Sequence, residues 1–319
     1  MSAALARPLI YLVRALPGGD DLALVRELFE VAGNAPRPPP RDRLLAEARQ
    51  AATIVVTYLD RVDAELLSAL PRLRHVASYG VGVNHIDVEA CRARGVVVTN
   101  TPDVLTDATA DLALALLLAA ARRVAEGDRV VRSGRWTEVD PGWLLGTQVT
   151  GKTLGVIGFG RIGQAVARRA AGFSLRLLYT SRRLIDFPGA QRVPLEELLA
   201  RSDFVSLNVP LTSSTDNLLS RERIFAMKRG AVLVNTARGQ VIDEEALAEA
   251  LRSGHLAAAG LDVFRDEPRV PASLLALENV VLTPHLGSGT RETRAAMTRL
   301  VLEDVARVGR GEEPLHRVA

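Results

Sequence analysis

Short apolar runs alternate with segments of helical spacing along almost the whole chain, a pattern that predicts an α/β protein. In the first hundred residues the predicted strands are 9–13, 53–58, 75–79 and 96–99, and the predicted helices lie near 21–31 and 63–70. The proline-rich run 36–40 is expected to be a surface loop, because the pattern resumes on both sides of it. These elements predict a parallel sheet covered by helices.

The rest of the pattern predicts a second, larger sheet. A long helix over 106–133 and a loop over 134–150 precede six strand-like runs, which cover 153–158, 175–180, 204–208, 231–235, 258–263 and 280–283. Six strands joined by crossover helices match the doubly wound dinucleotide-binding fold, whose usual order 3-2-1-4-5-6 makes the last three strands neighbours. An amphipathic helix over 291–308 is expected to return to the first domain. The predicted domains are residues 1–100 with 288–319 and, inserted between them, residues 101–287.

Three glycines lie between the first predicted strand of this second sheet and the helix that follows it. Gly158, Gly160 and Gly163 have the spacing G-x-G-x-x-G, directly after an apolar run and directly before residues with helical spacing. Such a loop allows a tight turn, a close approach of a pyrophosphate to the backbone, and close packing of helix on strand. A glycine-rich turn without a ligand is the alternative, but the strand before and the helix after favour a dinucleotide site.

Composition narrows the class of protein without changing this picture. The 319 residues are 48% apolar and 24% charged, as in ordinary globular domains, and the formal net charge is only +3. The chain contains neither a basic block nor interleaved aromatic and basic residues, so neither nucleic acid nor a membrane surface is predicted as a partner. The apolar run 112–121 is too short to cross a bilayer and is predicted as a buried helix. The single cysteine, Cys91, excludes an internal disulfide and favours a reducing, cytoplasmic environment.

Three charged side chains follow the last three predicted strands. Arg238, Glu267 and His285 come after the fourth, fifth and sixth of the runs given above. Ligands of open α/β sheets bind beyond the carboxyl ends of the strands, so these side chains are expected at one edge, near the nicotinamide. Each alone is better explained as an exposed loop residue, but together, on successive strands, they favour an active site.

This set of groups suits the reduction of a 2-oxo acid by a hydride. Arg238 can bind the substrate carboxylate with two hydrogen bonds and polarise the carbonyl. His285 can protonate the developing alkoxide, and Glu267 can orient the imidazole and favour its charged form. This chemistry requires no metal.

These residues lie in motifs that resemble those of the D-isomer-specific 2-hydroxyacid dehydrogenases, and most closely the glyoxylate/hydroxypyruvate reductases among them. The similar segments extend over nearly the whole chain and are 78–82 (SYGVG), 100–106 (NTPDVLT), 158–163 (GFGRIG), 209–212 (VPLT), 235–239 (NTARG), 260–264 (GLDVF), 267–268 (EP) and 283–285 (TPH). The resemblance implies a flavodoxin-like substrate domain with an inserted Rossmann domain. It also implies reduction of glyoxylate or hydroxypyruvate to a D-2-hydroxy acid with NAD(P)H, and a homodimer formed largely through residues 106–150.

The resemblance further implies roles for individual residues. Arg238, Glu267 and His285 are the implied catalytic set. The substrate is expected to contact the backbone of Val81 and Gly82 and the side chains of Leu59, Arg238 and His285. The predicted cofactor contacts, which include the glycine loop, are Thr106, Gly158, Phe159, Gly160, Arg161, Ile162, Gly163, Ser181, Arg182, Arg183, Asn208, Val209, Pro210, Thr215, Thr236, Ala237, Asp262, His285 and Gly287.

The end of the predicted strand 175–180 indicates which cofactor is preferred. NAD-binding versions of the fold carry an acid there that binds the ribose 2′-OH, whereas this chain has Ser181, Arg182 and Arg183. Guanidinium groups pair with a 2′-phosphate, so NADP(H) is expected to be preferred and NAD(H) to be possible. The alternatives are a solvated loop, or Asp186 reaching back to a 2′-OH.

Two positions depart from the family pattern, and other functions of the fold stay open. Asn84 stands where an acid is usual, and Asn208 replaces a common histidine but can still hydrogen-bond a cofactor. Corepressors that sense dinucleotides and bind peptides share the fold and a similar trio, and phosphite-type dehydrogenases are a third candidate. Trp136 and Trp143 in the loop 134–150 are predicted as packing residues or, alternatively, as dimer contacts.

Overall fold

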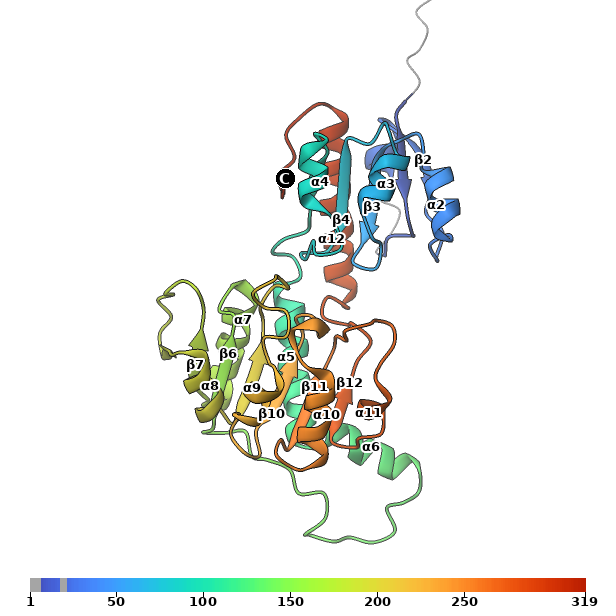
Figure 1. The fold of residues 1–319 in the computed structure, drawn as a ribbon. Helices are drawn as coiled ribbons and strands as arrows, with labels where there is room; N and C mark the ends of the chain where they lie inside the picture. The colour runs from blue at the N-terminus through green and yellow to red at the C-terminus, as the bar shows by residue number, and fades with distance from the viewer. Residues whose placement is uncertain (1–6, 18–21) are drawn as a thin grey trace, which may run out of the picture. The chain divides into compact units, whose positions relative to one another are not determined.

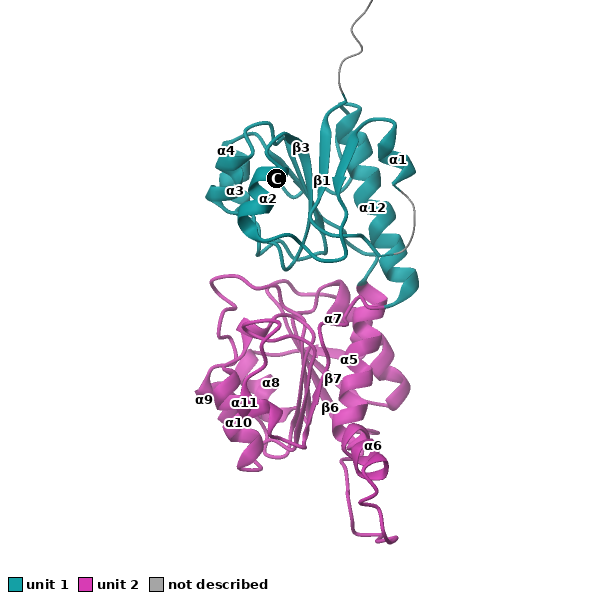
Figure 2. Cartoon of the chain, turned by 90° about the vertical axis from the view of Figure 1, so that its right-hand side faces the viewer, with its two compact units in different colours: residues 1–105, 290–319 teal, residues 106–289 magenta. Residues whose placement is uncertain are grey.

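The computed structural model describes residues 7–17 and 22–319, which form two compact units (Figure 2). Unit 1 comprises residues 1–105 and 290–319, and unit 2 comprises residues 106–289. Unit 2 is therefore inserted into the chain of unit 1. Each unit is a parallel sheet between two layers of helices, so the predicted fold class of two doubly wound α/β domains is confirmed.

Unit 1 is built on a five-stranded sheet with the order β2-β1-β3-β4-β5. Its strands are β1 (Leu9–Leu12), β2 (Glu30–Gly33), β3 (Ala51–Thr57), β4 (His75–Tyr79) and β5 (Val97–Thr99). One face is covered by α2 (Arg41–Glu47), α3 (Ala64–Ala69) and α4 (Val88–Ala93), and the other by α1 (Ala23–Arg26) and α12 (Arg291–Gly309) (Figure 2). This is the flavodoxin-like strand order.

One predicted helix of unit 1 is shorter than expected, and a strand begins at its end. The helix expected near 21–31 is reduced to α1, and residues 30–33 form the edge strand β2; Asp21 itself lies outside the described residues. The side chains of β2 are exposed or half-buried, so its sequence carries no apolar alternation from which a strand could be predicted. The short helix α2 after the proline-rich loop was also not predicted.

Unit 2 is built on a seven-stranded sheet with the order β12-β11-β10-β9-β6-β7-β8. Its strands are β6 (Thr153–Ile157), β7 (Arg176–Thr180), β8 (Ala190–Arg192), β9 (Phe204–Leu207), β10 (Val232–Asn235), β11 (Ala258–Leu261) and β12 (Val280–Leu282) (Figure 1). The prediction of six strands is wrong by one, because β8 is a three-residue edge strand with largely exposed side chains. Counting β8 as the third strand restores the Rossmann order, with one additional strand at the far edge. The last three strands are neighbours, as predicted.

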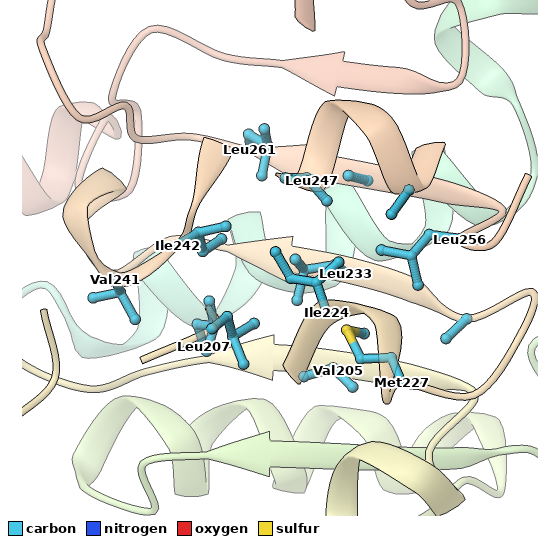
Figure 3. Close-up of a cluster of buried hydrophobic side chains, with 14 of the residues drawn as sticks. Val205, Leu207, Ile224, Met227, Leu233, Val241, Ile242, Leu247, Leu256 and Leu261 are labelled. Carbon is cyan, nitrogen blue, oxygen red and sulfur yellow. The ribbon is translucent and has the colours of Figure 1, made fainter. Parts of the chain in front are cut away.

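Helices cover both faces of this sheet and create two cores. On one face lie α5 (Thr106–Ala121) and α7 (Arg161–Ala170), and on the other α8 (Leu195–Arg201), α9 (Arg221–Phe225), α10 (Glu244–Arg252) and α11 (Ala272–Leu275). Figure 3 shows the second core, in which Val205, Leu233 and Leu261 come from adjacent strands and are buried under Ile224 and Leu247 of the helices. Each such side chain contributes roughly 1.5–3 kcal/mol on burial. This core fixes the strands whose ends carry the charged trio.

The helix predicted over 106–133 is two helices. It breaks between α5 and α6 (Val124–Arg132), because Arg123 has the left-handed φ of 54°. The loop predicted over 134–150 is present, but Trp136 and Trp143 are 55% and 42% exposed, so their prediction as packing residues is wrong for the single chain. Across residues 7–17 and 22–319, no helix combines the length and apolarity that a membrane span requires.

Candidate active site

The glycine loop between β6 and α7 leaves one side of its backbone open. Gly158 has φ of 88°, and a Cβ there would lie 2.6 Å from the carbonyl oxygen of Asn208; a Cβ on Gly163 would lie 2.1 Å from that of Gly158. These two glycines are therefore required by packing. Gly160 is not, because its φ is −77° and, among residues 7–17 and 22–319, nothing lies within 4 Å of a Cβ built on it. No side chain of the described residues caps α7, so the open surface at its N-terminus fits a pyrophosphate.

Two buried polar atoms at the ends of the neighbouring strands β9 and β10 fit a bound nucleotide as well. Asn208 follows β9 and Thr236 follows β10. Asn208 donates its amide nitrogen to the Ser206 carbonyl (3.2 Å) and hydroxyl (3.0 Å), but its Oδ1 has no hydrogen-bond partner in the described part of the chain. The buried Thr236 hydroxyl likewise has none there. Leaving such groups unpaired costs about 1–3 kcal/mol each, so both suit contacts with a dinucleotide.

The other predicted cofactor contacts lie at the same end of the sheet in unit 2. Ser181, Arg182 and Arg183 follow β7 and are exposed or half-buried. After β9, the Thr215 hydroxyl donates to the carbonyl of Pro210 at 2.6 Å and accepts the N–H of Thr212 at 2.8 Å, which shapes the loop that begins with Val209. Thr106 is the first residue of α5, and Phe159, Arg161 and Ile162 belong to the glycine loop and the first turn of α7.

Glu267 and His285 form a hydrogen-bonded pair. The Nδ1 of His285 lies 2.8 Å from Oε2 of Glu267, and each side chain is 17% exposed. The other carboxylate oxygen, Oε1, accepts the backbone N–H of Phe264 at 3.0 Å. A carboxylate accepts only, so Nδ1 carries the hydrogen, and Nε2 on the opposite side of the ring is the atom that can exchange a proton with a ligand.

Asp262 holds the turn that carries His285. Its fully buried carboxylate accepts hydrogen bonds from the Thr283 hydroxyl (2.6 Å) and from the N–H groups of Leu286 (2.6 Å) and Gly287 (2.8 Å). Burial raises the pKa of the Asp262 carboxyl, and these donors together with His285 oppose that rise. His285 has φ of 55°, a conformation that costs a non-glycine residue roughly 1–2 kcal/mol. The bonds to Asp262 stabilise it.

The loop that carries Arg238 packs against the loop that carries Glu267. Asn235 holds the first loop, because its amide nitrogen donates to the Arg238 carbonyl at 2.9 Å and its oxygen accepts the N–H of Ala237 at 3.0 Å. A Cβ on Gly239 would lie 1.9 Å from the backbone carbon of Phe264, so only glycine allows this approach. The ends of β10, β11 and β12 thus place the three charged residues along one edge of the sheet.

In unit 1 a side chain fixes the peptide between Val81 and Gly82, the predicted carboxylate site after β4. Asn100 donates its amide nitrogen to the Val81 carbonyl at 2.8 Å. In a trans peptide the N–H points away from the C=O, so this bond directs the N–H of Gly82 to the opposite side. Sequence reasoning did not predict this role for Asn100.

A second unpredicted contact fixes the loop that carries Leu59, which is 48% exposed. The buried Asp60 accepts the N–H and the hydroxyl of Thr57, both at 2.8 Å, and forms an ion pair with Arg14 at 2.6 Å. An aspartate three residues after a strand-ending threonine is a signal for such a turn, and it could have been used.

The fold and this site define a dinucleotide-dependent dehydrogenase with an arginine, a glutamate and a histidine at one sheet edge. The family described as "D-isomer specific 2-hydroxyacid dehydrogenase, NAD binding domain" matches residues 114–287. The chain is also 49% identical to a glyoxylate reductase of Pyrococcus furiosus, over 97% of this chain and 94% of that protein. This chain belongs to the D-isomer specific 2-hydroxyacid dehydrogenase family, as its motifs predicted.

Solved structures agree with this assignment. The TT0316 protein from Thermus thermophilus has a TM-score of 0.93 and 49% identity, covering 98% of this chain and 100% of that one. An NADPH-dependent glyoxylate/hydroxypyruvate reductase from Sinorhizobium meliloti, in complex with NADP and malonate, has a TM-score of 0.85 and 36% identity, covering 98% of this chain and 97% of that one. This chain therefore has the fold of a nicotinamide dinucleotide-dependent enzyme.

Proposed function

We propose that this protein reduces a small 2-oxo acid, glyoxylate or hydroxypyruvate, to the D-2-hydroxy acid with NAD(P)H. The observation that carries the proposal is the 2.8 Å hydrogen bond between Glu267 and His285, in the same unit as a glycine loop suited to a dinucleotide. The name of the Pyrococcus furiosus relative, glyoxylate reductase, supports this substrate class.

The roles of the side chains follow from their chemistry. When bound, the reduced nicotinamide supplies the hydride that adds to C2 of the substrate. Arg238 binds the carboxylate and polarises the carbonyl, and His285 donates a proton from Nε2 to the oxygen that becomes the hydroxyl. Glu267 holds the ring from Nδ1. One hydride and one proton are consumed for each hydroxy acid formed, and His285 regains its proton from solvent.

The proposed substrate contacts of unit 1 are the backbone of Val81 and Gly82 and the side chain of Leu59. Two findings support them: Asn100 orients the Gly82 N–H, and Asp60 fixes the loop that carries Leu59. For Asp262 and Ala237, the proposed contact with the nicotinamide end rests on the family resemblance, as does the proposed cofactor contact of Gly287. Asp262 in addition holds the His285 turn.

NADP(H) is the proposed preferred cofactor, because the strand that ends in Ser181, Arg182 and Arg183 lacks the acid that binds a ribose 2′-OH. Wild-type enzyme is expected to show a lower KM for NADPH than for NADH. The double variant Ser181→Asp with Arg182→Ala should raise the KM for NADPH far more than that for NADH. An unchanged ratio, or a wild type that works better with NADH, would show this assignment to be wrong.

A spectrophotometric assay tests the activity and its alternatives. Absorbance of the reduced nicotinamide should fall with glyoxylate or hydroxypyruvate. A rise with phosphite and the oxidised cofactor would instead indicate a phosphite-type dehydrogenase. Cofactor binding without turnover of any of these would favour a dinucleotide-sensing binding protein of the corepressor type.

A homodimer and a cytoplasmic location complete the proposal. The exposed Trp136 and Trp143 on the loop over 134–150 support the dimer, because large apolar side chains exposed together commonly mark an interface. The cytoplasmic location rests on the single buried thiol of Cys91.

A further inference from the structure

Side-chain hydrogen bonds hold the shape of the loop between β7 and β8, residues 181–189. The hydroxyl of Ser181 donates to the carbonyl of Arg183. Further along, the Tyr179 hydroxyl donates to the carbonyl of Ile185 at 2.7 Å and accepts its N–H at 3.1 Å. The first half of the loop is therefore tied to one side chain of β7 and to the residue that follows β7.

Aromatic rings join this loop to the glycine loop. Phe159, between Gly158 and Gly160, stacks on Tyr179 with a centroid distance of 4.1 Å and an interplanar angle of 20°. On another side it meets Phe187 edge-on at 5.2 Å and 81°. Phe159 and Tyr179 are fully buried. The loop that suits a pyrophosphate and the loop after β7 are therefore parts of one packed body.

Arg192, the last residue of β8, adds a third restraint. Its Nη2 donates to the Ser181 carbonyl at 2.9 Å and also lies 3.5 Å from the Arg182 carbonyl. With these carbonyls turned toward Arg192, the N–H groups of Arg182 and Arg183 are directed to the opposite side of the loop, because C=O and N–H are antiparallel in a trans peptide. Adjacent N–H groups directed to one side form an anion-binding surface.

The arginines of this loop form no ion pairs among the described residues, although Asp186 belongs to the same loop. Within the described part of the chain, none of the guanidinium groups of Arg182, Arg183 and Arg192 pairs with a carboxylate. Arg192 is occupied by loop carbonyls, whereas Arg182 and Arg183 are exposed. The loop thus offers two guanidinium groups and two N–H groups to a dianion, with Arg192 behind it.

We propose that Arg192 is a positioning residue for the 2′-phosphate of NADP(H). It shapes the loop so that Arg182 and Arg183 meet the phosphate, and it does not itself bind the phosphate. This inference rests on the proposed cofactor preference. It assigns part of that preference to β8, a strand outside the segment in which cofactor choice was predicted.

Nucleotide binding tests the inference without turnover. Kd values for NADPH and NADH are measured by nucleotide fluorescence for wild type, Arg192→Met, Arg182→Met and Arg176→Met. Arg176 is the matched control, because it is an exposed arginine at the opposite end of β7. Arg192→Met should weaken NADPH binding about tenfold and NADH binding less than about twofold. The reason is that the variant loses a charge-assisted hydrogen bond to the loop carbonyls, and only the 2′-phosphate depends on the shape of that loop. Arg176→Met should change neither.

Amide exchange of the ligand-free protein separates positioning from direct contact. Arg192→Met should accelerate hydrogen exchange in residues 181–187, whereas Arg182→Met should weaken NADPH binding without changing that exchange. An unchanged NADPH-to-NADH ratio in Arg192→Met would overturn the proposal. Loss of the preference for NADPH over NADH in Arg192→Met, with unchanged hydrogen exchange in residues 181–187, would also overturn it. That result would indicate that Arg192 binds the phosphate directly. Equal Kd values in wild type would instead overturn the cofactor preference itself, and with it the selectivity role of Arg192.

Discussion

The backbone carbonyl of Asp262 accepts the backbone N–H of His285 at 2.9 Å, while the Asp262 carboxylate accepts two N–H groups from the residues that follow His285. One buried residue at the end of β11 thus fixes the chain on both sides of the proposed proton donor. His285 is the residue with left-handed φ in this turn, so the restraint acts where the backbone is least favourable.

Thr283 tests how far activity depends on this restraint. Its hydroxyl donates to Asp262 at 2.6 Å, and Thr283→Val removes that donor from a buried carboxylate. We expect kcat to fall about tenfold, because small displacements of a reacting group cost that much or more. Thr283→Ser keeps the hydroxyl and should stay within about twofold of wild type. Equal kcat values for the Val and Ser variants would exclude the restraint from catalysis.

The charged trio should respond in a graded way. Arg238→Ala and His285→Ala should each lower kcat/KM at least about a hundredfold, whereas Glu267→Gln should retain more activity because an amide oxygen can still accept from Nδ1. Arg238→Lys keeps the charge without the bidentate fork and should remain impaired. Arg252→Ala, at the exposed end of α10, is the control for loss of an arginine. These effects are measured as kcat/KM with glyoxylate in steady-state kinetics. A fully active His285→Ala enzyme would show that His285 is not the proton donor.

His75 should make unit 1 sensitive to acid. Its Nε2 lies 2.9 Å from the Thr99 hydroxyl, and complete burial lowers its pKa to about 3 from 6.5. The folded state favours the neutral ring. The free energy of unfolding is therefore highest above pH 6.5, as far as His75 affects it, and it decreases as the pH falls toward 3. The loss approaches about 1.4 kcal/mol per pH unit.

Replacing His75 with Gln should flatten this pH dependence. Amide hydrogen exchange of β4 between pH 7 and pH 5 reports the unfolding of unit 1 directly. The free energy of opening, corrected for the intrinsic exchange rate, should fall with pH in wild type and much less in the variant. Parallel pH profiles would show that His75 is not the group responsible.

Leu59 should limit the size of the substrate. Wild-type enzyme is expected to favour glyoxylate over phenylpyruvate, and Leu59→Ala should raise the relative efficiency with phenylpyruvate several-fold. Leu24→Ala is a matched control, because Leu24 is also a leucine of unit 1 and is 49% exposed. If wild type already uses both substrates equally, Leu59 does not bound the pocket.

The exposed tryptophans should hold two copies of the chain together. Changing Trp136 and Trp143 to serine should shift the particle mass measured by light scattering from dimer toward monomer at micromolar concentration. Val139, 83% exposed on the same loop, provides a milder variant when changed to serine. A monomeric wild type would contradict the proposed dimer directly.

Local patterns predicted much of this fold and of its candidate site. The glycine spacing and the positions of Arg238, Glu267 and His285 after three strands depend on neighbours in sequence, so they could be recognised without a structure. The edge strands β2 and β8 could not, because their exposed side chains have no apolar period. The break before α6 depends on a single non-glycine residue, Arg123, in a left-handed conformation.

Contacts between distant segments account for what sequence reasoning missed in the site. Asp262 was predicted only as a cofactor contact, yet its carboxylate accepts hydrogen bonds from residues more than twenty positions further along the chain. Asn100 reaches back nineteen residues to Val81. Side-chain hydrogen bonds of this kind leave no periodic signal, so they become visible only when the strands are paired.

The division of unit 1 between the two ends of the chain has a consequence for protein synthesis. Helix α12 packs against β4, and residues 316–319 bond to the backbone of β5 and of Asn100. On the ribosome, the sheet of unit 1 is translated first, but α12, which packs against it, is translated only after all of unit 2. Unit 2 can fold as soon as residue 289 has left the exit tunnel, whereas unit 1 begins first and finishes last.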